Sequence, residues 1–166
     1  AHKKVKLLSG IFYDYSKLIS TIPLDQLITL VNDVPSEVTK AASALRCTSV
    51  LLVNILGTQA KASPYHWMYI YDENMYSTRV TQTHLLATSN TPKGLAGLQI
   101  EVYASPYRQF HESYDQIASK VVNEVCTMGL IDNIKTMHYH HVQYANIIYN
   151  HNRRNAQNTI LSYLRT

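Results

Sequence analysis

The segment from residue 47 to residue 104 constrains the fold more than any other, because it contains four β-prone stretches. Residues 47–56 are rich in Val, Leu and Ile, and residues 98–104 alternate apolar and polar side chains. Between them, residues 65–71 and 76–83 flank the polar turn Asp72-Glu73-Asn74. Short polar turns between β-prone runs are typical of antiparallel hairpins, and a period of two is typical of a half-buried strand. The segment therefore predicts antiparallel strand pairing.

Helical patterns flank this segment on both sides. Apolar residues recur at helical spacing in residues 24–31, in a short helix opening at Pro35, in residues 113–128 and in residues 152–164. In residues 113–128, Ser113 is placed to cap the helix and Gly129 to end it.

Residues 5–21 predict two or three short strands, including a buried-strand run at 17–22 that ends at Pro23. Residues 137–149 predict a long strand, and residues 88–97 a loop. Helices and strands do not alternate strictly. The chain therefore predicts an α+β fold with a mixed, largely antiparallel sheet flanked by helices.

Length and composition limit the classes of protein to consider. The 166 residues fit a single domain, 1–166, and 46% hydrophobic with 16% charged residues is a globular composition. The net charge is +4, but the basic residues are scattered, so we expect no nucleic-acid partner. No apolar run approaches the ~20 residues of a membrane span, so we expect no membrane partner. The two distant cysteines, Cys47 and Cys126, favour a cytoplasmic protein with buried thiols, with a disulfide as the open alternative.

Catalytic motifs are missing from the sequence. There is no nucleophile elbow and no phosphate-binding loop, and Gly94-Leu-Ala-Gly97 precedes a strand instead of opening a helix. His138, His140 and His141 form a cluster that His66 could join, but the spacing of a metal site is absent. We therefore assign no catalytic or metal-binding residue, and the alternative of a metal at the histidine cluster stays open.

Three stretches carry a resemblance to a known family. The first is residues 14–24, Asp-Tyr-Ser-Lys-Leu-Ile-Ser-Thr-Ile-Pro-Leu. The second is residues 66–72 with 76–81, followed by the strand 98–103. The third is residues 144–151, Tyr-Ala-Asn-Ile-Ile-Tyr-Asn-His, with Arg153 and the final helix. In this order they resemble the substrate-binding region of flavin-dependent amine oxidases, protoporphyrinogen oxidase-like enzymes and UDP-galactopyranose mutases. Asn150 and His151 stand where the mutase-type strand has Asp and Met.

The resemblance implies a fragment of a flavoprotein. Family members hold FAD through an N-terminal glycine-rich βαβ unit and a C-terminal glycine-containing segment, and neither occurs here. We therefore expect FAD in the intact protein, no cofactor on this fragment and no turnover by it alone. Residues 1–22 would be strands leading out of the missing FAD-binding domain. The intact protein would be an FAD-dependent oxidoreductase or a mutase-like isomerase acting on a small molecule, with a UDP-sugar as one candidate substrate.

Five residues are candidates for binding that substrate. The resemblance matches Arg79 to an Arg that contacts the substrate's diphosphate and Tyr149 to a Tyr that bonds a phosphate oxygen. Trp67 is placed to stack on a uracil or sugar face, and Tyr103 and Asn146, together with Arg108, are possible pocket linings. The alternatives are an ion pair of Arg79 with Glu101 or Asp72, a rim position for Tyr149 and a core position for Trp67.

Two rival functions stay open. The chain could be a stand-alone, non-catalytic binding module for a nucleotide-sugar or a protein partner. It could also be a regulatory domain with a structural histidine cluster, for which bound zinc would be the evidence.

Overall fold

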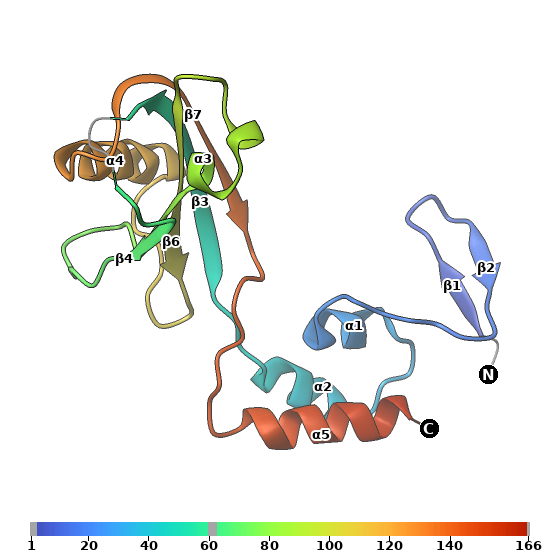
Figure 1. Ribbon diagram of the computed structural model, residues 1–166. Coiled ribbons are helices and arrows are strands. Elements are labelled where there is room, and N and C mark those ends of the chain that lie inside the picture. Colours follow the sequence, from blue (N-terminus) through green and yellow to red (C-terminus); the bar gives the residue numbers. More distant parts are fainter. Residues whose placement is uncertain (1–2, 60–62, 166) are drawn as a thin grey trace. The chain divides into compact units, whose positions relative to one another are not determined.

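The computed structural model describes residues 3–59 and 63–165, which divide into two compact units. One unit comprises residues 1–45 and 151–166, and the other comprises residues 46–150. Figure 1 shows the order of the elements along the chain. The predicted single substrate-binding domain, 1–166, stays a prediction.

The first unit joins a small hairpin to three helices. Its elements are β1 (Lys4–Lys6), β2 (Phe12–Asp14), α1 (Leu24–Leu30), α2 (Ser36–Ala44) and α5 (Arg153–Leu164). Pro23 and Pro35 immediately precede α1 and α2, where a proline ends the preceding extended segment and requires no helical N–H. Ile28, Val38, Ala42 and Ile160 are buried together and form the core of this unit.

The run 17–22 does not form the buried strand that its sequence predicts. It has no strand structure, and Leu18 and Ile19 are 55% and 90% exposed. A strand needs a neighbour to satisfy its backbone hydrogen bonds, and β1 and β2 pair only with each other in the described residues. The run therefore forms no regular secondary structure, and its apolar side chains are exposed.

The second unit is built around one antiparallel sheet. Its elements are β3 (Ser49–Thr58), β4 (Trp67–Tyr69), β5 (Arg79–Gln82), α3 (Thr83–Leu86), the 3₁₀ helix η1 (Thr88–Asn90), β6 (Ala96–Ala104), α4 (Tyr114–Thr127) and β7 (Asp132–Val142). The strand order is β4-β5-β6-β3-β7, and every pairing is antiparallel. The predicted α+β fold with a largely antiparallel sheet is confirmed.

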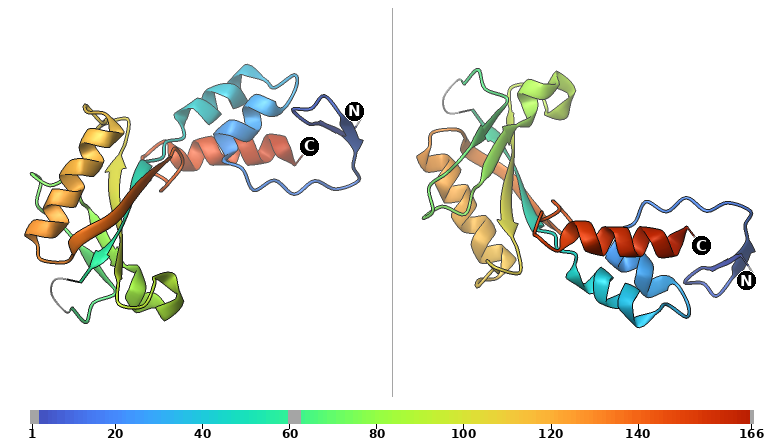
Figure 2. Two further views of the ribbon diagram at one scale, coloured as in Figure 1. Left: turned by 90° about the horizontal axis from the view of Figure 1, so that it is seen from above. Right: turned by 90° about the horizontal axis from the view of Figure 1, so that it is seen from below.

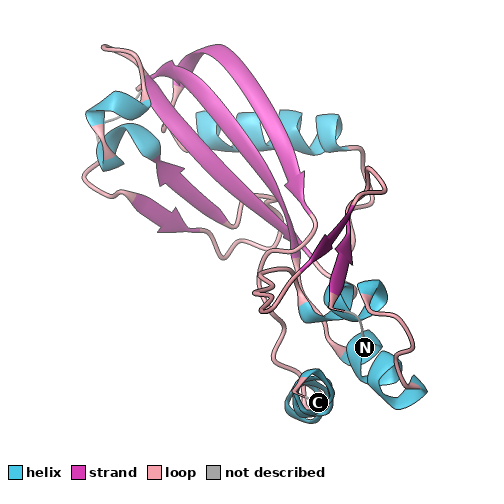
Figure 3. Cartoon of the chain, turned by 90° about the vertical axis from the view of Figure 1, so that its right-hand side faces the viewer, coloured by secondary structure: helices cyan, strands magenta, loops and turns pink. Residues whose placement is uncertain are grey.

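The two faces of this sheet differ in what covers them. On one face, strand residues such as Leu51, Val53 and Ile100 pack against Ile117 and Val121 of α4 and are almost completely buried. Figure 3 shows α4 running along the sheet, and Figure 2 shows α3 on the side opposite α4. We call the side opposite α4 the open face.

The open face carries the other half of each strand. Because directly paired residues point to the same side, the register places polar and aromatic side chains there in rows across the strands. One row is Tyr69, Arg79, Glu101, Leu52 and His140, and the next is Trp67, Thr81, Gln99, Asn54 and His138.

Two boundaries in this unit differ from the prediction. β7 covers residues 132–142 instead of 137–149, because the register changes beyond the Val50–Val142 pair. The later residues still bond to residues 46–48, but only through the isolated bridge Cys47–Ile147 and a few backbone hydrogen bonds. Residues 83–90, predicted as the end of a strand and the start of a loop, form α3 and η1. These short helices pack on Gly97, where an added Cβ would lie 2.5 Å from the Thr83 hydroxyl oxygen.

Candidate functional site

Arg79 lies at the centre of a polar cluster on the open face. It pairs with Tyr69 of β4 on one side and with Glu101 of β6 on the other, so adjacent strands present all three side chains together. The guanidinium forms an ion pair with the Glu101 carboxylate and lies 5.9 Å from the centre of the Tyr69 ring. The pKa of Arg79 is raised, first by a hydrogen bond with Tyr69 and further by Glu101.

Tyr103 and Asn146 extend the cluster. The Tyr103 hydroxyl donates a 2.7 Å hydrogen bond to the second carboxylate oxygen of Glu101, and the Asn146 side chain bonds Tyr103 in turn. Burial and the bond to Glu101 raise the pKa of Tyr103, and Asn146 opposes them. The backbone of Asn146 is held by Thr48, through a 2.8 Å bond from the Thr48 N–H to the Asn146 carbonyl. We call Tyr69, Arg79, Glu101, Tyr103 and Asn146 the arginine cluster.

Burial within the arginine cluster separates a fixed part from an accessible part. The Glu101 side chain is 7% exposed, whereas the Arg79 side chain is 36% exposed. The buried Glu101 carboxylate has a charged hydrogen-bond donor in Arg79 and a neutral one in Tyr103, so both of its oxygens have partners. It therefore holds the Arg79 guanidinium in one orientation. Nε of Arg79 is buried without a hydrogen-bond partner among the described residues, so a ligand does not reach it from solvent. A guanidinium has five N–H donors, and those on the exposed part of Arg79 can bind an oxyanion such as a phosphate.

Trp67 lies on the same face, in the neighbouring row. It pairs with Thr81, two residues along β4 from Tyr69, and it is 55% exposed. It is therefore not a core residue, and its ring is accessible to a flat apolar ligand face.

Tyr149 occupies a different setting from the one predicted. It lies beyond the end of β7, in the segment that returns toward Arg46, and it is 78% exposed. Asn146 is three residues earlier in the same segment. The structure thus brings Arg79, Tyr103 and Asn146 together, places Trp67 beside them on the open face, and puts Tyr149 outside any strand.

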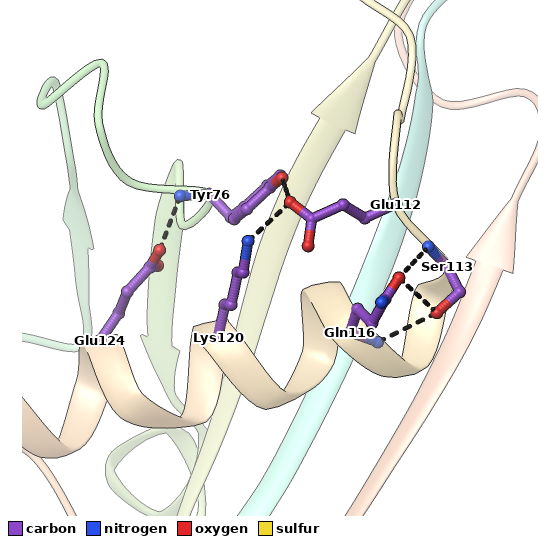
Figure 4. Close-up of polar contacts among 6 residues, drawn as sticks. All are labelled: Tyr76, Glu112, Ser113, Gln116, Lys120 and Glu124. Atoms are coloured by element: carbon purple, nitrogen blue, oxygen red, sulfur yellow. Dashed lines mark hydrogen bonds and ion pairs between the residues drawn. The ribbon is translucent and has the colours of Figure 1, made fainter.

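A second polar network fixes the turn that leads into Arg79. Glu124 of α4 accepts hydrogen bonds from the backbone N–H groups of Tyr76 and Ser77 at 2.8 and 3.0 Å. The Tyr76 hydroxyl bonds Glu112, which also forms a 2.7 Å ion pair with Lys120 (Figure 4). Lys120 lowers the pKa of Glu112, and the bond to Glu112 raises the pKa of Tyr76. Because β5 begins two residues after Ser77, these contacts help to position Arg79.

The histidine cluster is split between the two faces of the sheet. His138 and His140 lie on the open face, whereas His141 faces α4 and stacks on Tyr114 with ring centres 5.0 Å apart. Within residues 3–59 and 63–165, no three His, Cys, Asp or Glu side chains are grouped to hold a metal ion.

The two cysteines are separate thiols. Cys47 and Cys126 are both partly buried, and they form no disulfide with each other. Burial, reinforced by Asp132, raises the pKa of the Cys126 thiol. A raised pKa disfavours the reactive thiolate.

Two members of the arginine cluster are not among the substrate-binding candidates that the sequence indicates. The sequence suggests Glu101 only as an ion-pair partner of Arg79, and Tyr69 only as part of a β-prone run. The signal for Glu101 was its position between Ile100 and Val102 in an alternating strand, since a carboxylate inside a central strand needs a partner. No comparable signal marks Tyr69, because its role depends on the strand register.

Comparisons with known proteins identify the fold. No protein-family model and no curated protein matches the chain. Among solved structures, reduced UDP-galactopyranose mutase superposes with a TM-score of 0.88 at 19% identity over 99% of this chain. A candidate protoporphyrinogen oxidase from Exiguobacterium sp. 255-15 gives 0.68 at 16% identity over 96%, and the PF1083 protein from Pyrococcus furiosus gives 0.64 at 10% over 86%. At these identities the likeness is one of fold.

The chain spans about a third of the length of these solved proteins, covering 36%, 36% and 35% of them. In the part of the chain that the structure describes, no helix is long and apolar enough to cross a membrane.

The described residues do not fit a flavin diphosphate site. Such a site needs a parallel βαβ unit with a glycine-rich turn at a helix N-terminus, and every strand pair described here is antiparallel. Gly94 and Gly97 lead into β6 and not into a helix. We therefore assign none of these residues to a flavin.

Proposed function

We propose that this chain is the substrate-binding region of a longer flavin-dependent enzyme, either an amine-oxidase-like oxidoreductase or a UDP-sugar mutase-like isomerase. In this proposal FAD is bound by other segments of the intact protein, and the present residues bind and orient a small-molecule substrate. The chain alone would have no turnover. A UDP-sugar fits the open face because it carries phosphates, which Arg79 can bind, and flat base and sugar faces, on which Trp67 can stack.

The observation that carries the proposal is the arginine cluster on the open face of the sheet. Arg79 is held by a buried carboxylate and turned toward the open face, with the exposed ring of Trp67 one row away. An oriented guanidinium binds a phosphate through paired hydrogen bonds, and an exposed indole ring can stack on a base or a sugar. The fold shared with reduced UDP-galactopyranose mutase supports a ligand of this kind.

The exposed apolar residues of the first unit also support a larger protein. Leu8, Ile11 and Phe12 near the β-hairpin, and Leu18 and Ile19 after it, are all more than half exposed. A contiguous stretch of large exposed apolar side chains is typical of a surface that another protein segment covers. We propose that residues 1–22 pack against the flavin-binding domain, as the family resemblance implies.

The test begins with the protein at its natural length. Its visible spectrum after gel filtration should show bound flavin, while the 166-residue chain should be colourless. UDP should then bind the intact protein, and Arg79→Ala should weaken binding by about tenfold or more, because a charge-assisted phosphate contact contributes about 1.5–3 kcal/mol.

Arg154→Ala is the matched control. Arg154 is exposed on α5, outside the arginine cluster, so its removal should leave UDP binding nearly unchanged. An intact protein that is colourless and takes up no added FAD would refute the flavoenzyme proposal.

A stand-alone binding module is the second candidate function. Its support is that all members of the arginine cluster lie within residues 46–150, so one compact unit supplies the whole cluster. This module would bind an anionic ligand at Arg79 in a protein that carries no flavin. The spectrum of the intact protein separates the two functions.

A further inference from the structure

Thr48 lies next to the arginine cluster without being one of its members. It immediately precedes β3, in which Val50 pairs with Tyr103 of β6. Both its main chain and its hydroxyl form hydrogen bonds with Asn146, in the segment that follows β7. The structure therefore connects Thr48 to the cluster through a residue that belongs to it.

The main chain of Asn146 is held on both sides by Thr48. The Thr48 N–H donates a 2.8 Å hydrogen bond to the Asn146 carbonyl, and the Thr48 hydroxyl accepts one of 3.0 Å from the Asn146 N–H. β7 ends at Val142, and beyond it the described residues form the isolated bridge Cys47–Ile147 in place of a continuous ladder. The position of Asn146 therefore depends on Thr48 more than it would inside a regular strand.

A series of hydrogen bonds leads from Asn146 to Arg79. The bond from the Asn146 side chain lowers the pKa of Tyr103, so it is donated to the phenol oxygen, where it stabilises the deprotonated form. The Tyr103 hydroxyl donates its single proton to one oxygen of Glu101 at 2.7 Å, and the other oxygen of Glu101 accepts a bond from Arg79. Successive hydrogen bonds of this kind strengthen one another.

We propose that Thr48 is a positioning residue for the anion site at Arg79. It acts through the hydrogen bonds of Asn146, Tyr103 and Glu101. Without the Thr48 hydroxyl, the Asn146 N–H loses its acceptor, and the Asn146 side chain is free to move away from Tyr103. The Glu101 carboxylate is then less restrained, and the Arg79 guanidinium is less well oriented for an oxyanion. The effect on ligand binding rests on the proposed function, whereas the effect on Tyr103 does not.

Three variants of the protein at its natural length separate positioning from general stability. Thr48→Val keeps the shape of the side chain and removes the hydroxyl, whereas Thr48→Ser keeps the hydroxyl. Thr58→Val is the matched control, because Thr58 at the other end of β3 also donates its hydroxyl to a main-chain carbonyl, that of Asp132 at 3.2 Å. The control therefore makes the same chemical change on the same strand, away from the arginine cluster.

The first measurement is the titration of Tyr103 by carbon NMR of ring-labelled tyrosine, with its signal assigned from Tyr103→Phe. Thr48→Val should raise the pKa of Tyr103 further, because the bond from Asn146 that lowers it is weakened. Thr48→Ser and Thr58→Val should leave this pKa at its native value. A general loss of stability would not single out one tyrosine in this way. An unchanged titration in Thr48→Val, or an equal shift in Thr58→Val, overturns the proposal.

The second measurement is the affinity for UDP, by isothermal titration calorimetry on the same samples. Thr48→Val should bind UDP about threefold to tenfold more weakly, which corresponds to the loss of one hydrogen bond. Thr48→Ser and Thr58→Val should bind it as the native protein does. If Thr48→Val binds UDP as well as the native protein, the positioning role is refuted and the proposed anion site stands. If the native protein binds no UDP, the proposed anion site fails, and the titration of Tyr103 decides whether Thr48 fixes the cluster.

Discussion

Glu101 is the residue on which the arginine cluster depends. Its side chain is almost completely buried, and its two carboxylate oxygens are used by Arg79 and Tyr103. Replacing this buried, charged acceptor leaves its hydrogen-bond donors partly without partners. The free energy of unfolding should therefore fall by more than it does when a surface ion pair is removed.

Glu101→Gln is therefore expected to destabilise the chain by about 1–2 kcal/mol, since bonds to charged groups are stronger but Arg79 is partly exposed. Urea denaturation of both proteins measures the difference. The comparison is Glu37→Gln on the exposed surface of α2, which should shift stability by less than about 0.5 kcal/mol. Equal effects for the two variants would show that Glu101 is no anchor for the cluster.

Tyr103 predicts a pH dependence at the alkaline end. Burial and the bond to Glu101 raise its pKa in the folded chain above the ordinary value of 10.0. The folded chain thus holds this proton more tightly than the unfolded chain. The contribution to stability is complete below about pH 10 and is lost as pH rises through the folded pKa.

Denaturation measured from pH 8 to pH 11 should show stability falling above about pH 10, with a smaller fall in Tyr103→Phe. Tyr71→Phe is the control, because Tyr71 is 89% exposed and lies outside the helices and strands. An unchanged slope in Tyr103→Phe would contradict the assigned hydrogen bond.

At the scale of secondary structure elements, α4 shows what local sequence determines. The Ser113 hydroxyl caps this helix by accepting a 3.3 Å hydrogen bond from the backbone N–H of Gln116 (Figure 4). In turn, the side-chain oxygen of Gln116 accepts a 3.0 Å hydrogen bond from the backbone N–H of Ser113. Gly129 ends it with a φ of 68°. Both ends were predicted, because capping depends on residues within one turn of the helix.

Ser113→Ala removes this cap and should destabilise the chain by about 1 kcal/mol. Ser119→Ala is the matched control, because Ser119 lies within the same helix, where alanine is the better helix former. Thermal unfolding followed by circular dichroism measures both. A control that loses as much stability as Ser113→Ala would disprove the capping contribution.

Elements whose form depends on distant partners were predicted less well. The run 17–22 has the composition of a buried strand, but no described strand pairs with it. β7 ends at Val142 because its register against residues 46–48, more than 90 residues away in sequence, shifts beyond that point. The same reason applies to the site: Arg79, Tyr103 and Asn146 were candidates individually, whereas the register of three strands brought Tyr69 and Glu101 to Arg79.

At the scale of the whole molecule, the two units differ in how completely they are covered. Residues 46–150 bury a continuous core beneath α4, whereas residues 7–22 of the other unit expose most of their large apolar side chains. Soluble proteins rarely leave a contiguous apolar stretch exposed unless a partner segment covers it.

Ile19→Asp tests whether residues 1–22 pack on a flavin-binding domain. Because Ile19 is 90% exposed, the substitution should change the stability of this chain by less than about 0.5 kcal/mol. In the intact protein a buried, unpaired carboxylate at that interface would be strongly unfavourable, so the purified protein should retain less than half of its flavin.

Leu30→Asp, at a 71% exposed position on α1 outside the segment, is the matched control and should retain its flavin. The absorbance ratio of flavin to protein after gel filtration gives the answer. Full flavin retention in Ile19→Asp would show that this segment does not contact the flavin-binding domain, whatever the open face binds.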